Sequence, residues 1–496
     1  MTTAADRRPQ LTEGWAERLG RARAGTLLAE ARTRVAADPW AVLLAQIVIS
    51  SFVVVTLTGL FLMFFYVPST APATYHGSYQ PLNGVEMSVA LQSTLDLSFD
   101  VRGGLLVRQL HNWGSSLMLA AVLLLIARIF FTGAFRSPRR LSWLVVFAVL
   151  VVAMAAGFTG MALPDDMLSG TSLAILHGVL QSIPVVGSWL AALLFGGGFP
   201  GDPLALFYSL HVIVLPLALA GLLAAGLLSA GARPLRRRAA VRSAGILVTV
   251  AGVLALMGAF ATVNPVWLYG PSDPGNATAG AGPVWYLAFV DGALRLIPPG
   301  WEIVAFGRTW TLAVLAPAAI ATLFLLTIAV YPFAERWATG DRRDHPGPSR
   351  ARDYPARTAI GVAGIAFYVV LWAAAGSDTI ATQFGLSIES VLLTMQVLAL
   401  GGPLAAGALA WRIALELRSR SLDVARHGFE TGRIVRLPGG EYVEIHAQLP
   451  ATQRLELEAD DRPRPIMLRP DENGQIGVVR RAQAVASRLF WRGVDE

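Results

Sequence analysis

Eight apolar stretches, each about as long as a membrane-spanning helix, alternate with polar segments along this chain. The hydrocarbon core of a bilayer requires about 20 mostly apolar residues per helix. Stretches that meet this requirement lie at residues 40–66, 105–131, 141–163, 204–229, 243–263, 310–333, 357–375 and 388–414. The pattern predicts an all-α fold, a polytopic membrane bundle of eight transmembrane helices, which we number in chain order as the first to eighth spans.

Two further segments have patterns that do not fit a span. Residues 169–196 are apolar but contain Pro184 and Gly187, and we predict one or two helices at the membrane surface there. Residues 415–496 are polar and contain Pro-Gly turns, with a strand-like run at 441–445. They are predicted to form a small tail outside the membrane.

Arginine is distributed unevenly among the connecting segments. Seven Arg precede residue 40, and loops 132–140, 230–242 and 334–356 are also rich in Arg, whereas segment 164–203 has none. Short loops with excess Arg remain in the cytoplasm. The pattern therefore predicts a multi-pass protein of the plasma membrane with both termini cytoplasmic, and eight spans have the even parity that this requires.

Composition narrows the class of protein further. Of the 496 residues, 54% are hydrophobic and 15% are charged, a balance too apolar for a soluble protein of this length. The net charge of +7 is carried by Arg alone, and because these residues lie between spans we interpret it as topology and expect no nucleic-acid binding. The absence of Cys excludes disulfides, iron–sulfur ligation by thiolates and covalent attachment of a c-type heme.

Two histidines are the candidate metal ligands. Of seven His, only His111 and His211 fall within predicted spans, where ionisable side chains are costly and usually functional. Each lies about seven residues from the outer end of its helix. The second and fourth spans run in the same direction, so the two imidazoles lie at similar depth. They can supply both axial ligands of a b-type heme; the alternative is two unrelated His that hydrogen-bond within the bundle.

Three neighbouring residues favour heme binding. Arg108 lies one turn before His111, where it can pair with a heme propionate. Gly114, three residues after His111, removes a side chain on the face that a flat macrocycle would approach. Pro216 follows His211 by five residues and is expected to kink the fourth span.

Several motifs in order resemble the cytochrome b subunit of respiratory cytochrome bc complexes. They are RQLHNWGS at 108–115, GFTG at 157–160 with Leu163-Pro164, His211 to Pro216, and PVWY at 283–286. The runs DDMLSG at 165–170 and HGFETG at 427–432 are similar to the actinobacterial branch, which uses menaquinol. The resemblance extends from about residue 12 to about residue 450.

The resemblance implies a specific assembly. It implies two hemes stacked across the membrane, a quinol site near the outer heme, a Rieske iron–sulfur protein, a c-type cytochrome subunit and a homodimer within the complex. We accordingly divide the chain into four regions. They are a cytoplasmic amphipathic segment (1–39), a heme-binding four-helix core (40–229), a four-helix membrane domain with the outer quinol-site loop (230–414) and a cytoplasmic tail (415–496).

The chain departs from this family pattern at the inner heme. The family's inner ligands lie about fourteen residues further along the same helices, where this chain has Leu125 and either Ala225 or Gly226. None of these can ligate iron. Arg128 stands where the family has an inner propionate partner, and we interpret it as an anchor of the helix end. Residues 227–242 also lack the His and the acid of the family's inner quinone site.

The outer quinol-site loop is altered as well. The second position of the motif Pro283-Val284-Trp285-Tyr286 carries, in the family, an acid that accepts a quinol proton, and valine cannot accept one. No catalytic residue is therefore assigned. The acids that could take the role are Asp291, Glu302, Asp165 and Asp166. For each of them the alternative is an ordinary solvated loop carboxylate.

Three functions remain open at this point. The chain is the b subunit of an ordinary quinol–cytochrome c reductase (a translocase), a divergent single-heme paralogue, or a non-catalytic membrane scaffold for a Rieske-like or cytochrome c-like partner. Fourteen residues of helix span about 21 Å, a gap that would have no electron carrier. We therefore expect electron transfer from menaquinol through one heme b, ligated by His111 and His211, with Arg108 and Gly114 in its site.

Overall fold

Eight helices dominate the computed structural model, which describes residues 38–196, 200–229, 237–273, 275, 284–345, 347–458, 465–468 and 476–491. Within these residues, eight helices are long and apolar enough to cross a membrane, which confirms the eight predicted spans. They are α2 (Pro39–Leu62), α4 (Gly104–Phe131), α5 (Arg140–Ala162), the helix made of α8 (Leu204–Ser209), η2 (Leu210–Val214) and α9 (Leu215–Ser229), α10 (Arg237–Phe260), α12 (Leu312–Thr339), α13 (Pro355–Ala374) and α15 (Ile388–His427). Residues 1–37 of the predicted N-terminal segment lie outside the described residues.

Capping residues define where several of these helices begin and end. The side chain of Asp38 accepts a hydrogen bond from the backbone N–H of Trp40 at 3.2 Å, and Pro39 occupies the first turn, where no N–H donor is needed. At its C-terminal end, α12 is capped by Gly340. The φ of this residue is +68°, the left-handed conformation that glycine adopts most easily.

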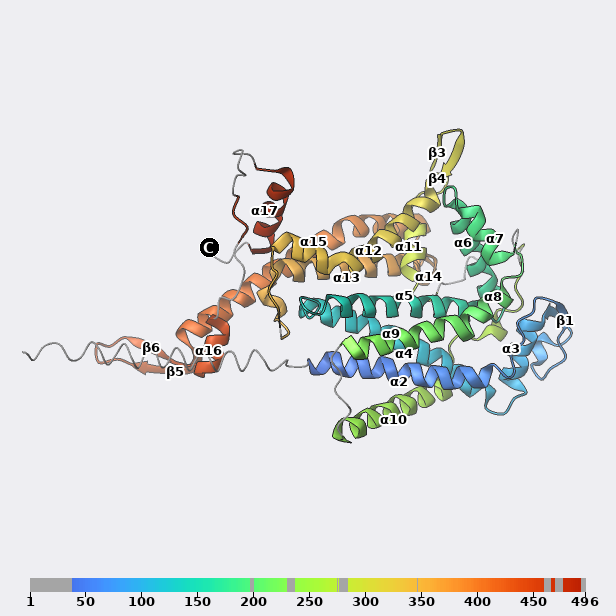
Figure 1. The fold of residues 1–496 in the computed structure, drawn as a ribbon, viewed down its shortest axis with the longest axis horizontal. Coiled ribbons are helices and arrows are strands. Elements are labelled where there is room, and N and C mark those ends of the chain that lie inside the picture. The colour runs from blue at the N-terminus through green and yellow to red at the C-terminus, as the bar shows by residue number, and fades with distance from the viewer. Residues whose placement is uncertain are drawn as a thin grey trace, which may run out of the picture.

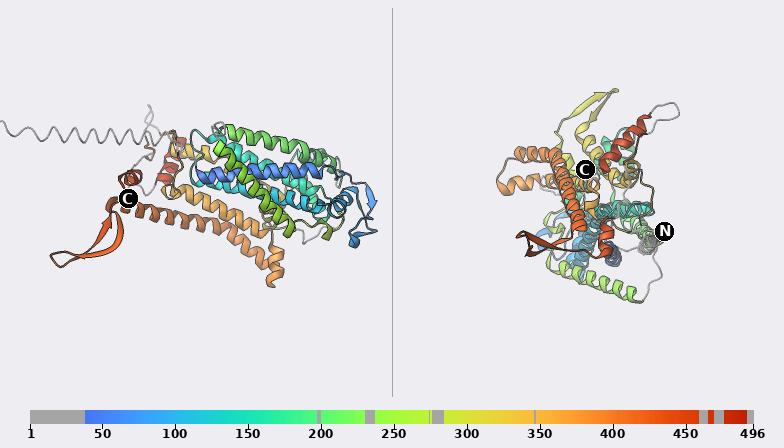
Figure 2. Two further views of the ribbon diagram at one scale, coloured as in Figure 1. Left: turned by 90° about the horizontal axis from the view of Figure 1, so that it is seen from below. Right: turned by 90° about the vertical axis from the view of Figure 1, so that its left-hand side faces the viewer.

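The spans form two groups that pack along their lengths (Figures 1 and 2). In the first group α2 packs against α4, α5 packs against α9, and α10 packs against both α2 and α4. In the second group α13 packs against α15 and against the short helix α11 (Ala288–Leu296), while α12 contacts α5. The second and fourth spans, which carry the two membrane histidines, both belong to the first group.

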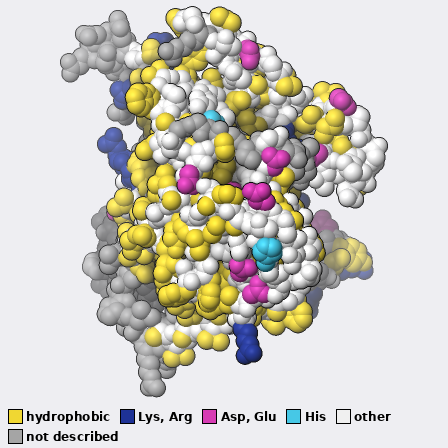
Figure 3. Space-filling model, turned by 90° about the vertical axis from the view of Figure 1, so that its right-hand side faces the viewer, with side chains coloured by type: hydrophobic (Ala, Val, Ile, Leu, Met, Phe, Trp, Pro, Cys, Tyr) yellow, Lys and Arg dark blue, Asp and Glu magenta, His cyan; other side chains and the backbone are white. Residues whose placement is uncertain are grey.

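Short elements cover one end of the bundle (Figure 1). We name it the Arg-poor end, because the described residues of segments 63–103 and 163–203 lie there and these segments contain a single Arg. Strand β1 (Pro72–Thr74) pairs antiparallel with β2 (Glu86–Ser88), and β3 (Glu302–Ala305) with β4 (Arg308–Thr311). The remaining elements are η1 (Gln80–Leu82), α3 (Val89–Phe99), η3 (Val266–Leu268) and α14 (Ser377–Phe384). In Figure 3, acidic side chains lie over the centre of this face and basic ones lie toward its edges.

The apolar segment 169–196 forms two short helices at this end, as predicted. They are α6 (Met167–Ser182) and α7 (Gly187–Phe195), and the chain between them contains Pro184. Asp166 caps α6 by accepting a hydrogen bond from the backbone N–H of Ser169 at 3.1 Å. Phe195 of α7 and Leu173 of α6 are buried in one cluster, so the two helices pack on each other over the end of α5.

Buried charges hold the opposite end together, which we name the Arg-rich end. Arg357, in the first turn of α13, is buried and pairs with buried Glu335 of α12, with Arg357 Nε and Glu335 Oε2 at 2.9 Å. Arg136 donates from Nη1 to the Tyr354 hydroxyl at 2.9 Å. Because a buried charge is stable only with a partner, these contacts tie the loop between α4 and α5 to α12 and α13. The 3-10 turn η4 (Ala351–Asp353) precedes α13 there.

Helix α15 extends past residue 414, the predicted end of the eighth span, while the tail boundary at residue 415 stays a prediction. Helix α15 continues to His427 because the residues after the membrane span include helix-stabilising pairs, such as Arg420 Nε with Glu416 Oε1 at 2.8 Å. The hairpin of β5 (Phe429–Arg436) and β6 (Tyr442–Ala447) follows, and β6 confirms the strand predicted at 441–445. Helices α16 (Ala451–Glu458) and α17 (Val478–Trp491) complete the described tail.

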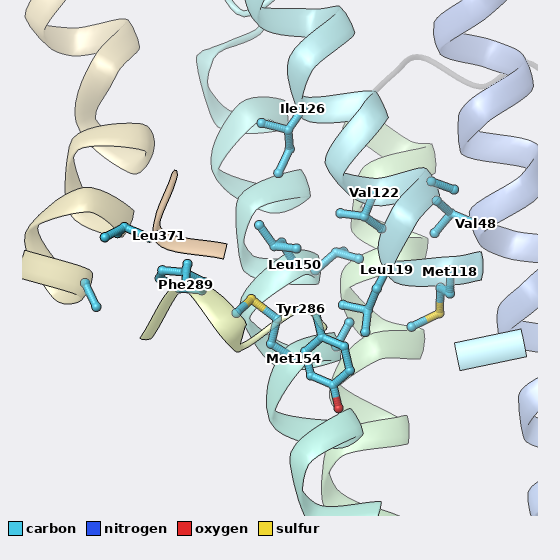
Figure 4. Close-up of a cluster of buried hydrophobic side chains, with 14 of the residues drawn as sticks. Val48, Met118, Leu119, Val122, Ile126, Leu150, Met154, Tyr286, Phe289 and Leu371 are labelled. Atoms are coloured by element: carbon cyan, nitrogen blue, oxygen red, sulfur yellow. The ribbon is translucent and has the colours of Figure 1, made fainter. Parts of the chain in front are cut away.

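The main apolar core runs from the first group of helices into the second, where Phe289 of α11 and Leu371 of α13 belong to it. Val48 of α2, Leu119 and Val122 of α4 and Leu150 of α5 are buried there and point toward one another (Figure 4). Val122 comes eleven residues after His111, about three helical turns closer to the Arg-rich end. The interior on that side of the histidines is therefore filled by packed side chains.

Candidate heme-binding site

His111 and His211 face each other inside the first group of helices. His111 comes seven residues after Gly104, the first residue of α4, and His211 comes seven residues after Leu204, the first residue of α8. Their ring centroids are 6.0 Å apart, and the ring planes are inclined by 65°. The structure therefore brings together the two histidines that the sequence singled out, at equal depth from the Arg-poor end.

Each imidazole is held through Nδ1. His111 Nδ1 lies 3.1 Å from the carbonyl oxygen of Val55, and His211 Nδ1 lies 2.9 Å from that of Ala156. A carbonyl oxygen can only accept, so both Nδ1 atoms carry the hydrogen and both Nε2 atoms keep a lone pair. This is the tautomer that a metal-ligating histidine requires, with its second nitrogen donating to the protein.

The helices that hold the two rings use the same short sequence pattern. In α2 the pattern runs from Val55 to Thr58 and Gly59, and in α5 it runs from Ala156 to Thr159 and Gly160. The threonine hydroxyls lie 3.1 Å from His111 Nδ1 and 3.4 Å from His211 Nδ1. The GFTG motif at 157–160 contains the pair on α5, but no role toward the histidines was predicted for it. The repeated Thr-Gly pair on the first and third spans was the signal that could have revealed this role.

Gly59 and Gly160 leave room for the rings. A Cβ added at Gly160 would lie 2.5 Å from His211 Cε1, and one at Gly59 would lie 3.1 Å from His111 Cε1. Both distances are shorter than ordinary contact between carbon atoms, about 3.5–4.0 Å. Glycine is therefore needed at both positions for the rings to keep their places.

The spacing of the rings fits a metal ion between them. A metal–imidazole nitrogen bond is about 2.0 Å, so two rings on opposite sides of one ion have centroids about 6 Å apart. The observed 6.0 Å matches that requirement. A direct hydrogen bond between the two rings would bring them closer together, so the spacing leaves room for an ion between them, and ligation by both rings stays a prediction.

Arg108 supplies the remaining feature expected of a heme site. Its side chain is buried, and Nη2 donates to the carbonyl oxygen of Asn264 at 2.9 Å. Its Nη1 is buried with no hydrogen-bond partner among the described residues. An unpaired guanidinium nitrogen one turn from His111 would suit the carboxylate of a heme propionate. The donor set thus fits a bis-histidine heme.

Gly114 and Pro216, two further residues noted in the sequence, have local roles in helix packing and helix geometry. A Cβ at Gly114 would lie 2.8 Å from Val55 Cγ2, so this glycine permits close packing of α4 against α2, and its role toward a macrocycle stays a prediction. Pro216 follows a turn of π-helix, η2, that contains His211. Because proline has no N–H to donate, the regular helical hydrogen bonding is interrupted here, and the helix adopts a wider turn rather than ending.

Comparisons with known proteins agree with this geometry. The family described as Cytochrome b(N-terminal)/b6/petB matches residues 116–271. The cytochrome b subunit of the Streptomyces coelicolor cytochrome bc1 complex is 42% identical over 484 residues, which cover 93% of this chain and 89% of that protein. The chain belongs to the family of cytochrome b subunits of cytochrome bc1 complexes. Its counterpart in Mycobacterium tuberculosis H37Rv is 41% identical over 431 residues, 83% of this chain and 78% of that one.

A solved structure supports the fold of this cytochrome b subunit. A chain of a hyperthermophilic respiratory Complex III superposes with a TM-score of 0.54 and covers 75% of this chain and 91% of its own length. The sequence identity is 18%, so this similarity concerns the arrangement of helices alone.

The half of this cytochrome b subunit nearer the Arg-rich end lacks the ligands and the paired glycines found around His111 and His211. Leu125 is buried, and a Cβ at Gly226 would already be in contact with Val145 Cγ1 at 3.6 Å. Helices α2 and α5 run opposite to α4. The positions on them at the depth of Leu125 are therefore found fourteen residues before Gly59 and Gly160. Ala45 and Val146 stand there. Neither the ligands nor the paired glycines recur at this level.

Arg128 has a partner within the protein. Its Nε lies 2.6 Å from Asp38 Oδ2, and its Nη2 lies 3.1 Å from Asp38 Oδ1. This bidentate pair joins the end of α4 to the N-cap of α2. The contact agrees with the interpretation of Arg128 as an anchor of the helix end.

The quinol-site loop of the family lies against the end of α5. Pro283 is outside the described residues, whereas Val284 and Trp285 are half-buried and Tyr286 is buried. The Tyr286 hydroxyl touches the face of α5 at Gly157, where a Cβ would lie 2.3 Å from that oxygen. Burial raises the pKa of Tyr286 well above its ordinary value, so its phenol stays protonated.

Asp291 and Glu302, the two candidate acids of this loop, do not lie where a proton acceptor for a buried quinol would be needed. Asp291 Oδ2 lies 2.7 Å from Arg295 Nε, and Arg295 Nη1 also lies 3.3 Å from Asp378 Oδ2. Asp291 is thus engaged in an ion-pair network. Glu302 is exposed at the start of the β3–β4 hairpin, which projects from the bundle (Figure 1). Neither position resembles a carboxylate held beside a buried substrate.

Asp166 is the acid with the most unusual surroundings. Its Oδ1 accepts hydrogen bonds from Ser169, whereas its Oδ2 is buried with no partner among the described residues. Burial raises the pKa of Asp166, although the bonds from Ser169 and the positive charge of Arg108 oppose the rise. A carboxyl group shielded from water near the cationic partner of the histidine site is chemically suited to exchange a proton.

Asp165 lines a separate cavity of about 330 Å³ at the Arg-poor end. The cavity lies between the β1–β2 hairpin, α6 and the chain near Ser272, and Glu86 also lines it. Burial raises the pKa of Asp165, and the neighbouring Asp166 adds to the rise. The two consecutive acids therefore face different surroundings, one toward this cavity and one toward the interior.

Proposed function

We propose that this chain is the cytochrome b subunit of a bc1-type complex that carries electrons through a single heme b bound by His111 and His211. The observation that supports this most directly is the pair of imidazoles at 6.0 Å, each with its Nδ1 held by a backbone carbonyl. Membership of the family supplies the class of complex. When bound, the heme would supply a one-electron carrier within the membrane.

The residues around the pair have separate roles in this proposal. The Nε2 atoms of His111 and His211 ligate the iron, and the carbonyl groups of Val55 and Ala156 fix the required tautomer. Arg108 pairs with a propionate through its unpartnered Nη1. The buried arginine thus neutralises a negative charge that would otherwise be costly inside the membrane.

A single heme follows from what fills the other half of the bundle. Leu125 and either Ala225 or Gly226 stand in place of the ligands. Ala45 and Val146 stand in place of the glycines, and Arg128 is paired with Asp38. The apolar core of Figure 4 occupies the interior at intermediate depth. We infer that electrons leave this subunit from the Arg-poor side, toward a partner, rather than crossing to the Arg-rich side.

The substrate and partners proposed here follow from the family. The substrate is menaquinol, and the partners are a Rieske iron–sulfur protein and a c-type cytochrome subunit, in a complex with two copies of this chain. In this proposal the Arg-poor end faces outward, both termini lie in the cytoplasm, and the multi-pass chain belongs to the plasma membrane. Reporter fusions after residues 138 and 345 should then be cytoplasmic, and fusions near 180 and 275 should be outside.

Asp166 is our proposed proton acceptor in place of the acid missing at Val284. Of the four acids considered, it is the one whose buried carboxylate oxygen has no partner among the described residues, and burial raises its pKa. Asp166→Asn should lower menaquinol oxidation at least tenfold while the heme stays bound. Asp291→Asn is the matched control, because Asp291 is already ion-paired and should affect activity little.

Val284 also favours a second function, a non-catalytic or divergent membrane subunit. A valine at this position removes the family's proton acceptor, so the chain could retain its heme and partners without oxidising quinol. Absence of menaquinol oxidation in a complex with a full complement of heme and partner subunits would support this alternative over the first.

Heme content per chain is the decisive experiment. The purified full-length protein should yield one heme b per polypeptide in a pyridine hemochrome assay. His111→Ala and His211→Ala should each abolish all b-type absorbance, whereas His177→Ala on α6, outside the pair, should retain it. Two hemes per chain, or residual b-type absorbance in either variant, would refute the single-heme proposal. No heme at all would favour a scaffold.

A further inference from the structure

The tail hairpin carries a group of metal-ligating side chains far from the membrane histidines. Strands β5 and β6 extend beyond the end of α15, away from the helical bundle (Figures 1 and 2). Glu430 of β5 lies directly opposite His446 of β6 in the antiparallel register. Glu444 precedes His446 by two residues, so both side chains project from the same face of the strand.

An irregularity in the hairpin brings the third ligand into place. The register shifts between Glu430 and Ile434, where Gly432 adopts a φ of +69°. The backbone N–H of Gly432 donates to Glu444 Oε1 at 2.8 Å and orients that carboxylate. As a result, one ligand atom from each of Glu430, Glu444 and His446 lies within 4.8 Å of the other two.

The donor set selects a class of ion. Two carboxylates so close together repel each other, and a bound cation would relieve that repulsion. The imidazole distinguishes this group from an acidic patch, because Mg²⁺ and Ca²⁺ prefer oxygen ligands throughout, whereas Zn²⁺ and similar divalent transition metals bind nitrogen and oxygen together. Three protein ligands on an exposed face would leave the remaining positions to water.

We propose that Glu430, Glu444 and His446 form a Zn²⁺-class divalent metal site that fastens the tail hairpin. A two-stranded hairpin with both faces exposed is marginal on its own in water. A cation that bridges β5 and β6 binds only the paired strands, so it stabilises them by mass action. The site is independent of the heme, of quinol chemistry and of membrane orientation.

Zinc binding to the detergent-purified full chain tests this proposal. After treatment with a chelator, titration calorimetry with Zn²⁺ should show one saturable site. Loss of a ligand's outer partner alone typically lowers metal affinity about 10–100-fold, so Glu430→Gln, Glu444→Gln and His446→Ala should each lower it at least tenfold. Mg²⁺ at the same concentration should not compete.

Two controls keep the result interpretable. His427→Ala removes an exposed histidine at the end of α15, outside the group, and should leave zinc affinity unchanged. Hydrogen exchange of residues 429–447 should slow on addition of Zn²⁺ in the unmodified protein and in this control, but not in His446→Ala. Absence of saturable binding, equal loss in the control, or displacement by Mg²⁺ would overturn the proposal, whatever the heme content proves to be.

Discussion

A methyl group added at Gly160 tests in detail how this cytochrome b subunit holds His211. The added Cβ would lie 2.5 Å from His211 Cε1, 3.0 Å from Nδ1 and 3.1 Å from Nε2. Carbon atoms in contact are normally about 3.5–4.0 Å apart. The imidazole must therefore move by about 1 Å, because the methyl group is attached to the rigid backbone of α5.

That movement would break the contact that fixes the tautomer of His211. The hydrogen bond from Nδ1 to the carbonyl oxygen of Ala156 is 2.9 Å long and would lengthen or be lost. Such a bond contributes about 0.5–1.5 kcal/mol net, and removal of an outer partner of a ligating histidine lowers metal affinity by about 10–100-fold. We expect Gly160→Ala to weaken heme retention by the same factor.

The assay is the rate at which heme transfers from each purified variant to an excess of apomyoglobin, together with the b-type absorbance before transfer. Gly59→Ala should have a smaller effect than Gly160→Ala, because its Cβ would lie 3.1 Å from His111 Cε1. Gly221→Ala, on α9, is the matched control, since its Cβ would meet nothing within 4 Å. Unchanged heme transfer in Gly160→Ala, or equal loss in Gly221→Ala, would refute this account of the site.

Three further predictions concern the quinol-site loop and the Arg-rich end. With Asp166 as a substitute for the family's acid, menaquinol oxidation by the complex should be slow but measurable, and Val284→Glu should raise its rate; rapid turnover by the unmodified complex would contradict this. Glu335→Ala leaves Arg357 buried without its partner, so thermal unfolding in detergent should reveal a loss of about 3–5 kcal/mol, and an unchanged midpoint would argue against the pair. Burial raises the pKa of Asp38, but the hydrogen bond and charge of Arg128 outweigh it, and the net pKa lies below the ordinary 3.8. The stability that the Asp38–Arg128 pair contributes is therefore present at neutral pH and is lost as pH falls through that lowered pKa. Asp38→Asn should remove this loss of stability in acid. An Asp38→Asn variant that still loses the same stability in acid would exclude Asp38 as the source.

The eight spans and the two candidate ligands could be predicted from the sequence alone. A lipid-exposed helix must be apolar along its whole length, so each span is visible in a window of about 20 residues. Histidine is costly in that setting, which made His111 and His211 conspicuous. Segment 169–196 could be excluded as a span by its proline and by the distribution of Arg, and the structure has two short helices there.

The partners of those residues depended on the tertiary structure. The carbonyl groups and threonines that hold the imidazoles lie more than 50 positions away in sequence, on helices whose rotation about their axes only packing determines. Gly114 fits the close approach of α4 to α2, Arg128 pairs with Asp38, and Asp291 pairs with Arg295 for the same reason. Apolarity along a span reports that a helix lies in lipid, but it does not report which face meets which neighbour. That choice arises from side-chain shape and from the pairing of buried charges between segments distant in the chain.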